Sequence, residues 1–159
     1  MKMAKILLIS IIFSLSFIRP DSVFLAEEKI EFPPDDLDPT ENYGEILNSS
    51  VEPLMGNERF LFDARFSVDR WWVVPITFTT RNPGLQVYST NNRSTTYEIG
   101  VGTFSASTDN WGVAYNKWQT FGSGYHVRYY SGLKAGTKYR LVVKGSGSGK
   151  LGAVDWVPK

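Results

Sequence analysis

From about residue 57 onward, apolar and polar side chains alternate with the period of two that is typical of β-strands. In the run WWVVPITFTT, residues 71–80, the even positions form one apolar face, made of Trp72, Val74, Ile76 and Phe78. Pro75 interrupts this run, and a proline that cannot donate to a sheet ladder predicts an edge strand or a bulge.

Similar short runs follow, separated by clusters of Gly, Asn, Pro and Ser, at 84–90, 95–106, 110–121, 124–132, 137–145 and 150–158. No stretch after residue 57 shows a helical period. Short strands at regular spacing predict an all-β domain in which two antiparallel sheets pack as a β-sandwich. We place this domain at residues 57–159, as a single domain with one core.

The first residues have the pattern of a secretory signal peptide. Lys2 and Lys5 precede an apolar run from Ile6 to Leu15 that continues to Ile18, which is too short to span a bilayer comfortably. We predict a signal peptide at 1–26 that is cleaved after Ala26, with an uncleaved membrane anchor as the alternative. The chain has no cysteine, so a lipid anchor and disulfides are excluded, and a secreted, extracellular bacterial protein is favoured, with association to the cell wall as one location.

Charge divides the rest of the chain. Residues 27–58 carry ten acids and one lysine, net −9, whereas residues 59–159 carry 13 Lys and Arg and five acids, net +8. The segment 27–56 is rich in acids and proline and poor in apolar residues, which predicts a disordered or loosely docked leader. It serves either as a solvated spacer or as a mask that lies on the basic domain.

The segment SGLKAGTKYRLVVKG, residues 131–145, resembles the strand entry of fibronectin type III and related Ig-like sandwiches at Leu133, Gly136, Thr137 and Tyr139. It is also similar to the closing strands of bacterial pre-peptidase-type sandwich modules. The resemblance implies an Ig/fibronectin-III-like sandwich, with a jelly roll as the other arrangement, and a tyrosine corner in which the Tyr139 hydroxyl bonds nearby backbone. The whole chain resembles small exported β-sandwich proteins of Bacillus-type bacteria, whose function is not known.

The residues offer little for catalysis. A nucleophilic triad would depend on His126, the one histidine, and the five carboxylates of the domain show no paired spacing. No cluster of His, Cys, Asp or Glu has metal-ligand spacing, and KGSGSGKLG, residues 144–152, lacks phosphate-loop spacing and is interpreted as a flexible hairpin loop. We therefore expect a protein that is not an enzyme and needs no cofactor or metal.

Binding is the favoured class of function. Strand alternation assigns Trp111, Tyr115, Tyr125 and Tyr129 to the core and leaves other rings and cations outside. The predicted ligand-binding residues of this outer face are Trp71, Trp118, His126, Arg128, Tyr130 and Arg140, with Lys117, Lys138 and Lys144 nearby.

Such a basic, aromatic face suits an anionic cell-surface polymer or carbohydrate, because rings stack on sugars and cations attract anions. A membrane surface is a second partner class, and nucleic acid is disfavoured because no signature of a nucleic-acid-binding fold is present. Two alternative functions remain open: a membrane-active, bacteriocin-like toxin with an acidic pro-segment, and a structural protein that self-associates through edge strands. The ligand and the oligomeric state are left open by the sequence.

Overall fold

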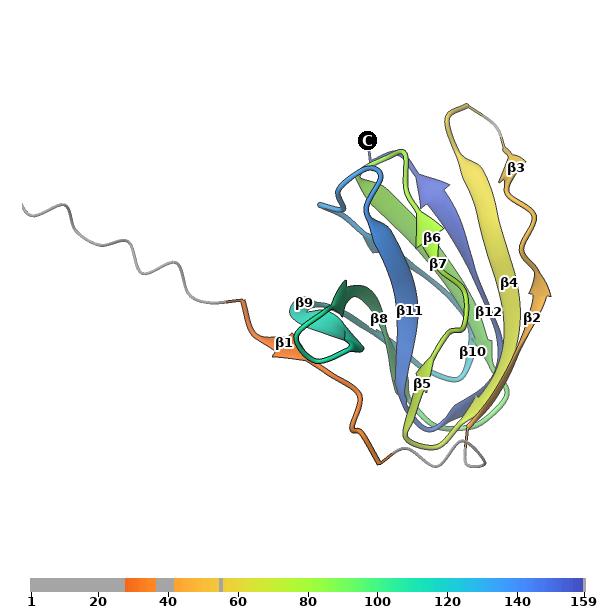
Figure 1. The fold of residues 1–159 in the computed structure, drawn as a ribbon. Helices are drawn as coiled ribbons and strands as arrows, with labels where there is room; N and C mark the ends of the chain where they lie inside the picture. The colour runs from red at the N-terminus through yellow and green to blue at the C-terminus, as the bar shows by residue number, and fades with distance from the viewer. Residues whose placement is uncertain (1–27, 37–41, 55, 159) are drawn as a thin grey trace, which may run out of the picture.

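The computed structural model describes residues 28–36, 42–54 and 56–158 (Figure 1). The predicted signal peptide and its cleavage site lie outside these residues. The strands are β1 (Ile30–Glu31), β2 (Tyr43–Asn48), β3 (Glu52–Pro53), β4 (Arg59–Val68), β5 (Trp71–Val73), β6 (Phe78–Thr79), β7 (Gly84–Asn91), β8 (Tyr97–Ser105), β9 (Asn110–Phe121), β10 (Gly124–Tyr130), β11 (Lys138–Gly145) and β12 (Gly147–Trp156).

Two antiparallel sheets pack face to face, which confirms the predicted β-sandwich. Sheet A has the order β1-β9-β8-β11-β5, with β6 also paired to β11. Sheet B has the order β10-β7-β12-β4-β2, with β3 also paired to β4. Within the described residues, no helix is long and apolar enough to cross a membrane.

The core between the sheets is rich in aromatic rings. Trp72, Val74 and Phe78 are buried, so the inner face predicted for residues 71–80 is confirmed. Pro75 lies between β5, at the edge of sheet A, and β6, as expected for a residue that ends strand pairing. The Tyr97 ring lies parallel to Phe121 with centroids 5.7 Å apart, and such ring pairs add to the burial of apolar area.

The segment that resembles a tyrosine-corner sequence makes the contact that the resemblance implies. The hydroxyl of Tyr139 accepts a hydrogen bond from the backbone N–H of Lys134 at 2.9 Å. Gly136 supplies the turn with φ of +76°, a conformation that glycine adopts without a steric penalty. Leu133 is buried beside this turn. The corner ties the connection between the two sheets to the start of β11.

The acidic segment is only partly as predicted. Within the described residues it forms β1 on sheet A and β2 and β3 on sheet B, so of the two alternatives, disordered or docked, the disordered one is wrong there, and the sandwich begins before residue 57. The reason is that the segment completes free sheet edges with backbone hydrogen bonds, which need little apolar area. Gly44 brings β2 close to the core, because a Cβ on Gly44 would lie 1.8 Å from the Trp72 ring.

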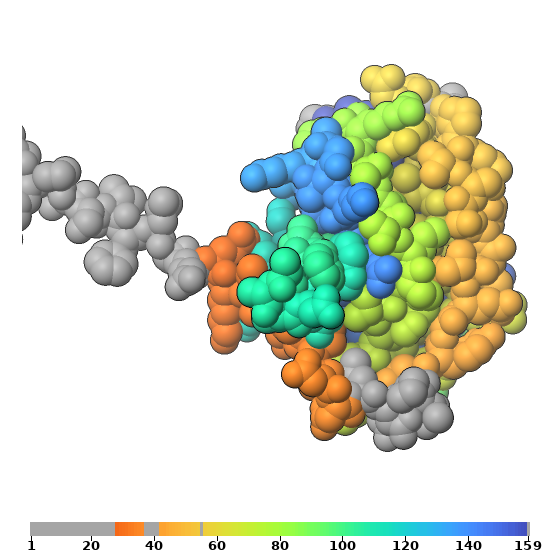
Figure 2. Space-filling view, in the orientation of Figure 1, coloured from red at the N-terminus to blue at the C-terminus, as the bar shows by residue number. Residues whose placement is uncertain are grey.

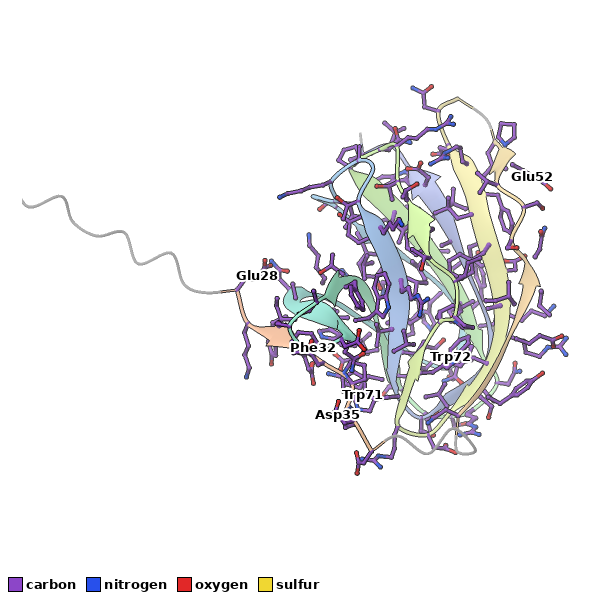
Figure 3. The ribbon with its side chains drawn as sticks, in the orientation of Figure 1. Glu28, Phe32, Asp35, Glu52, Trp71 and Trp72 are labelled. Atoms are coloured by element: carbon purple, nitrogen blue, oxygen red, sulfur yellow. The ribbon has the colours of Figure 1, made fainter. Side chains whose placement is uncertain are left out.

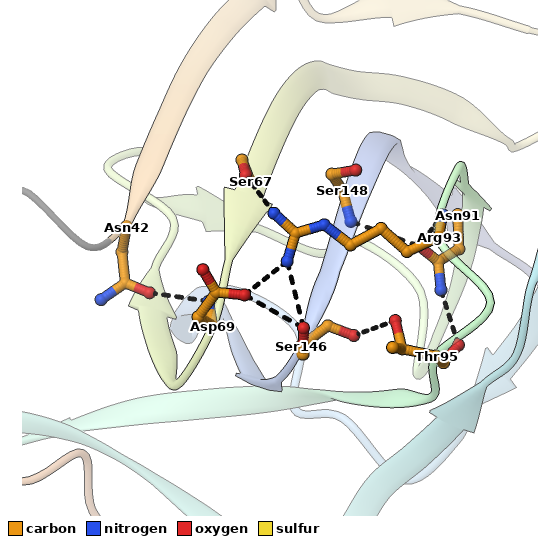
Figure 4. A network of polar contacts seen from close by, with 8 residues as sticks. All are labelled: Asn42, Ser67, Asp69, Asn91, Arg93, Thr95, Ser146 and Ser148. Carbon is orange, nitrogen blue, oxygen red and sulfur yellow. Dashed lines mark hydrogen bonds and ion pairs between the residues drawn. The ribbon is translucent and has the colours of Figure 1, made fainter.

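Polar side chains tie the turns together at one end of the sandwich (Figure 4). Arg93 pairs with Asp69 and donates to Ser146 and Ser67, and Asp69 also accepts from Ser146. The Arg93 hydrogen bond, with that of Ser146, lowers the pKa of Asp69. Asn91 accepts from the backbone N–H of Ser148. The network joins residues at the ends of strands and in the turns between them: Asn42, Ser67, Asp69, Asn91, Arg93, Thr95, Ser146 and Ser148.

The buried Tyr97 phenol predicts a loss of stability in alkali. Burial raises its pKa to about 12, although the hydrogen bond with Ser89 at 2.5 Å acts in the opposite direction. The unfolded chain releases this proton near pH 10 and the folded chain retains it, so the free energy of unfolding should fall as pH rises from about 10 to about 12. Urea unfolding over this range measures the slope, and Tyr97→Phe should make it shallower. An unchanged slope in Tyr97→Phe would contradict the assignment.

Candidate binding surfaces

The predicted site residues separate into two groups, three on β10 and three on sheet A. On β10, the side chains predicted to face outward lie on the inner face instead. In its ladder with β7, His126 lies opposite Ser89, Arg128 opposite Val87 and Tyr130 opposite Leu85. Directly opposite residues share one face of an antiparallel pair. Ser89, Val87 and Leu85 are buried, so the three predicted ligand-binding residues of β10 turn toward the interior, and their assignment to the outer face is wrong.

Each of these three side chains has a partner inside the protein. Tyr130 is 2% exposed and donates a hydrogen bond to the carbonyl oxygen of Ile99 at 2.6 Å, and burial raises the pKa of its phenol. Arg128 donates to the carbonyl oxygen of Thr120 and lies 5.7 Å from the centroid of the Phe121 ring. His126 lies within hydrogen-bond distance of a loop carbonyl oxygen. They close the side of the sandwich between β9 and β10.

Rings predicted to be in the core are instead exposed. Tyr125 is 64% exposed, Tyr129 51% and Tyr115 65%, so their predicted burial is wrong. On the outer face of sheet B, Tyr129 packs against Trp156 with centroids 4.7 Å apart. Strand β10 carries aromatic side chains at both parities, so alternation alone contains no signal that decides which of them face the core.

The outer face of sheet A does carry the predicted aromatic and basic residues. Val113 lies opposite Gly102 and Trp118 opposite Gly100, and the register shift between these pairs brings Val113 and Trp118 to the same face. A Cβ on Gly100 would lie 2.5 Å from Val113 and 2.8 Å from Trp118, so only glycine lets the indole lie against the strand.

At one end of this face, a lysine lies between two indole rings. The Nζ atom of Lys144 is 4.5 Å from the Trp118 ring centroid and 5.5 Å from that of Trp71, and the two indoles pack edge to face at 5.7 Å. The same Nζ lies 2.9 Å from carboxylate oxygens of Glu31 and Glu98. Trp71 and Trp118 thus face outward as predicted, and both of them contact Lys144.

At the other end, Arg140 stacks on a tryptophan beside a cleft. The guanidinium carbon of Arg140 is 4.8 Å from the Trp111 ring centroid, and its Nε donates to Oγ1 of Thr77 at 3.1 Å. Phe104 is 51% exposed and packs beside Trp111 with centroids 5.6 Å apart. Arg140 therefore faces outward as predicted, whereas Trp111, predicted for the core, stands on the outer face of sheet A.

The cleft has a volume of about 640 Å³, which is the size range of small-molecule and sugar sites. It opens between β4 and the β2–β3 connection on one side and the β6 region of sheet A on the other, and Phe104 of β8 and Trp111 of β9 also line it. Figure 2 shows this side of the molecule, with the green β5 and β6 region between the blue segment at the start of β11 and the yellow and orange β2 to β4 region. Its walls are mainly apolar, with cations at the rim, and include Val51, Arg59, Leu61, Ile76, Phe78, Phe104, Trp111 and Lys138.

Neither metal chemistry nor relatedness adds to this picture. In the part of the chain that the structure describes, no group of three or more His, Asp or Glu side chains is placed to hold a metal ion. No protein-family model matches the chain, and no curated protein matches it. The function is therefore argued from the two-sheet fold and its surfaces.

Proposed function

We propose that this protein is an exported, non-enzymatic binding module whose cleft, with the adjoining face of sheet A, binds an anionic cell-surface polymer or carbohydrate. The observation that carries the proposal is the stack of Arg140 on Trp111 at the mouth of the cleft. An aromatic face contacts the apolar face of a sugar ring, and a guanidinium binds carboxylate or phosphate groups through paired N–H donors.

The arrangement favours binding to repeated units rather than to an isolated ion. Phe104 and Trp111 offer two neighbouring rings, Lys138 lines the cleft, and Arg140 adds positive charge on the Trp111 ring. Thr77 holds the Arg140 side chain by a hydrogen bond, which reduces the conformational entropy lost on binding. The apolar walls below them exclude water from the contacts.

The test is retention of the mature protein on Gram-positive cell walls, with and without their teichoic acid, at low and high salt. We expect retention that falls when teichoic acid is stripped and when salt is raised, because exposed charges are screened. Arg140→Gln should weaken binding about tenfold or more, the effect of losing one charged hydrogen-bonding group. Trp111→Ala should weaken it similarly by removing the stacking surface.

The matched control is Arg65→Gln, which makes the same charge change at an exposed position of β4 in sheet B. It should leave retention unchanged. Equal losses in Arg65→Gln and Arg140→Gln would reduce the interaction to net charge and contradict a site at the cleft. Absence of retention under every condition would contradict a wall-polymer ligand altogether.

A further inference from the structure

At the Lys144 end of the outer face of sheet A, a segment of the same chain, residues 28–36, contacts the sheet. In the segment 28–36, strand β1 pairs antiparallel with β9, where Ile30 lies opposite Ala114 and Glu31 opposite Val113. The N–H of Tyr115 donates to the carbonyl oxygen of Lys29 at 2.8 Å. Figure 3 labels Glu28, Phe32 and Asp35 along this segment and Trp71 on the sheet. The segment therefore adds a short strand to the edge of sheet A.

The β9 edge, with Gly112 and Lys144 beside it, is here called the groove, and it contacts side chains of this strand as well as its backbone. A Cβ on Gly112 would lie 2.5 Å from both Ile30 and Phe32, so the missing side chain of this glycine makes room for an apolar residue and an aromatic one. Between them, Glu31 reaches Lys144 with 2.9 Å between Oε2 and Nζ. The groove thus accommodates the order apolar, acidic, aromatic.

The surroundings of Lys144 keep its side chain charged and in a position where it binds a carboxylate. Burial by itself lowers its pKa, but the hydrogen bonds to Glu31 and Glu98 outweigh burial and raise it, so the side chain stays an ammonium ion. Trp118 and Trp71 pack against this ion and limit its positions. Glu98 belongs to the neighbouring strand β8 and stays with the sheet, whereas Glu31 is brought by the added segment.

The resident segment is held by one ion pair, by a hydrogen bond from Asn110 to the carbonyl oxygen of the buried Pro33, and by a short ladder. Its ladder has two residue pairs, Ile30 is 47% exposed, and Glu28 and Lys29 are exposed. Segments with little buried apolar area and short ladders open at low free energy compared with a core strand. Opening would uncover the β9 edge, the space at Gly112 and the Lys144 ammonium together.

We propose that this groove is a docking site for an extended acidic peptide segment of a partner protein, which adds to β9 as a strand and places a carboxylate on Lys144, in competition with residues 28–36. The mode is strand addition, in which backbone bonds give affinity and side-chain pockets give specificity. The Lys144 ammonium and the space at Gly112 favour an acidic residue next to an apolar or aromatic one. A second copy of this chain would bring its own residues 28–36, and the test below distinguishes it by dimer formation. The site is separate from the cleft and does not depend on the function proposed there.

The experiment uses the full mature chain and a fluorescent peptide with the sequence of residues 28–36, followed by fluorescence anisotropy. Glu31→Lys places a second cation beside Lys144 and should release the resident segment, so this variant should bind the peptide at least tenfold more tightly than the unaltered protein. Adding Lys144→Gln to Glu31→Lys should remove that gain. A peptide with Gln in the place of Glu31 should bind Glu31→Lys at least tenfold more weakly.

Glu28→Lys is the matched control, because it makes the same charge change on the same segment at an exposed residue. It should bind the peptide as the unaltered protein does. Hydrogen exchange reports the place of binding: the Tyr115 amide should exchange faster in Glu31→Lys and regain protection with peptide.

Three results would overturn the proposal. The first is absence of binding to Glu31→Lys up to about 1 mM peptide, the range in which a tethered segment competes. The second is an equal gain in Glu28→Lys, which would indicate an effect of net charge. The third is a concentration-dependent dimer of Glu31→Lys that excludes the peptide, which would assign the groove to a second copy.

Discussion

Asp155→Ala should lower the free energy of unfolding by about 3 to 5 kcal/mol, the cost of removing one partner from a buried ion pair. The Asp155 side chain is fully buried and accepts from Nε of Arg59 at 3.1 Å and from Nη2 at 2.6 Å. It also accepts from the backbone N–H groups of Arg81 at 2.8 Å and Asn82 at 3.1 Å. Alanine would leave two backbone donors and Nε of the nearly buried Arg59 guanidinium without an acceptor, and Nη2 would keep only the carbonyl oxygen of Thr79 at 3.2 Å.

Urea unfolding of Asp155→Ala, compared at equal m values, measures this loss. Asp155→Asn is the control, because it keeps the shape and one acceptor oxygen while it removes the charge, and its loss should be smaller. The loss in Asp155→Ala is a large share of the roughly 5 to 15 kcal/mol that a domain of this size has. A change below about 1 kcal/mol would show that water replaces the carboxylate, contrary to its complete burial.

The architecture was predictable because period-two alternation depends only on local sequence. Residues 71–80 show why: their apolar parity is unambiguous, and Trp72, Val74 and Phe78 are buried as expected. The same signal could not mark Asp155 as the centre of a polar cluster. Arg59 lies 96 residues earlier in the chain, and no local spacing connects the two residues.

The alternation of side chains gave wrong predictions of which residues face the core in strands with aromatic residues on both faces and in strands with an irregular ladder. In β10, both parities are equally able to enter the core, and the choice is made by the register with β7. In β9, the register shift near Gly100 places Trp118 and Val113 on one face although their positions differ by five, which in a regular strand would put them on opposite faces. Trp71 and Arg140, on regular strands, were placed correctly.

The composition of residues 27–56 shows that the segment is acidic, but it does not show which part of the domain the segment contacts. Low apolar content predicts disorder when a segment must bury its own surface. Here β1 and β2 bond to strand edges that the rest of the sandwich leaves free, and Glu31 finds Lys144, a residue 113 positions later. A pattern read over a short stretch of sequence cannot predict a contact between residues so far apart in the chain.

The glycine-rich run predicted to be a flexible hairpin loop is instead mostly strand, and the prediction is wrong. β11 ends at Gly145 and β12 begins at Gly147. A Cβ on Gly147 would lie 2.6 Å from the Tyr97 ring. These glycines permit close approach of neighbouring groups, which composition cannot distinguish from flexibility.

Gly149→Ala is the second change from which we expect a large effect, a loss of about 3 kcal/mol or more in the free energy of unfolding. A Cβ at this position would lie 1.8 Å from the carbonyl oxygen of Thr90, and Gly149 has φ of +154°. The clash is with backbone of the paired strand β7, so it cannot be relieved by a side-chain rotation. The ladder between β7 and β12 would have to shift, and both strands are central in sheet B.

Gly124→Ala is the comparison for a glycine of positive φ without a steric contact. Gly124 has φ of +82°, and no atom lies within 4 Å of a Cβ built there, so alanine at this position carries only the backbone penalty of about 1 kcal/mol. Thermal and urea unfolding of both variants measure the difference. A much larger loss in Gly149→Ala would show that the contact with Thr90 and the φ of +154° together cost more than the positive φ of Gly124, whereas equal losses would mean that β7 yields at no cost.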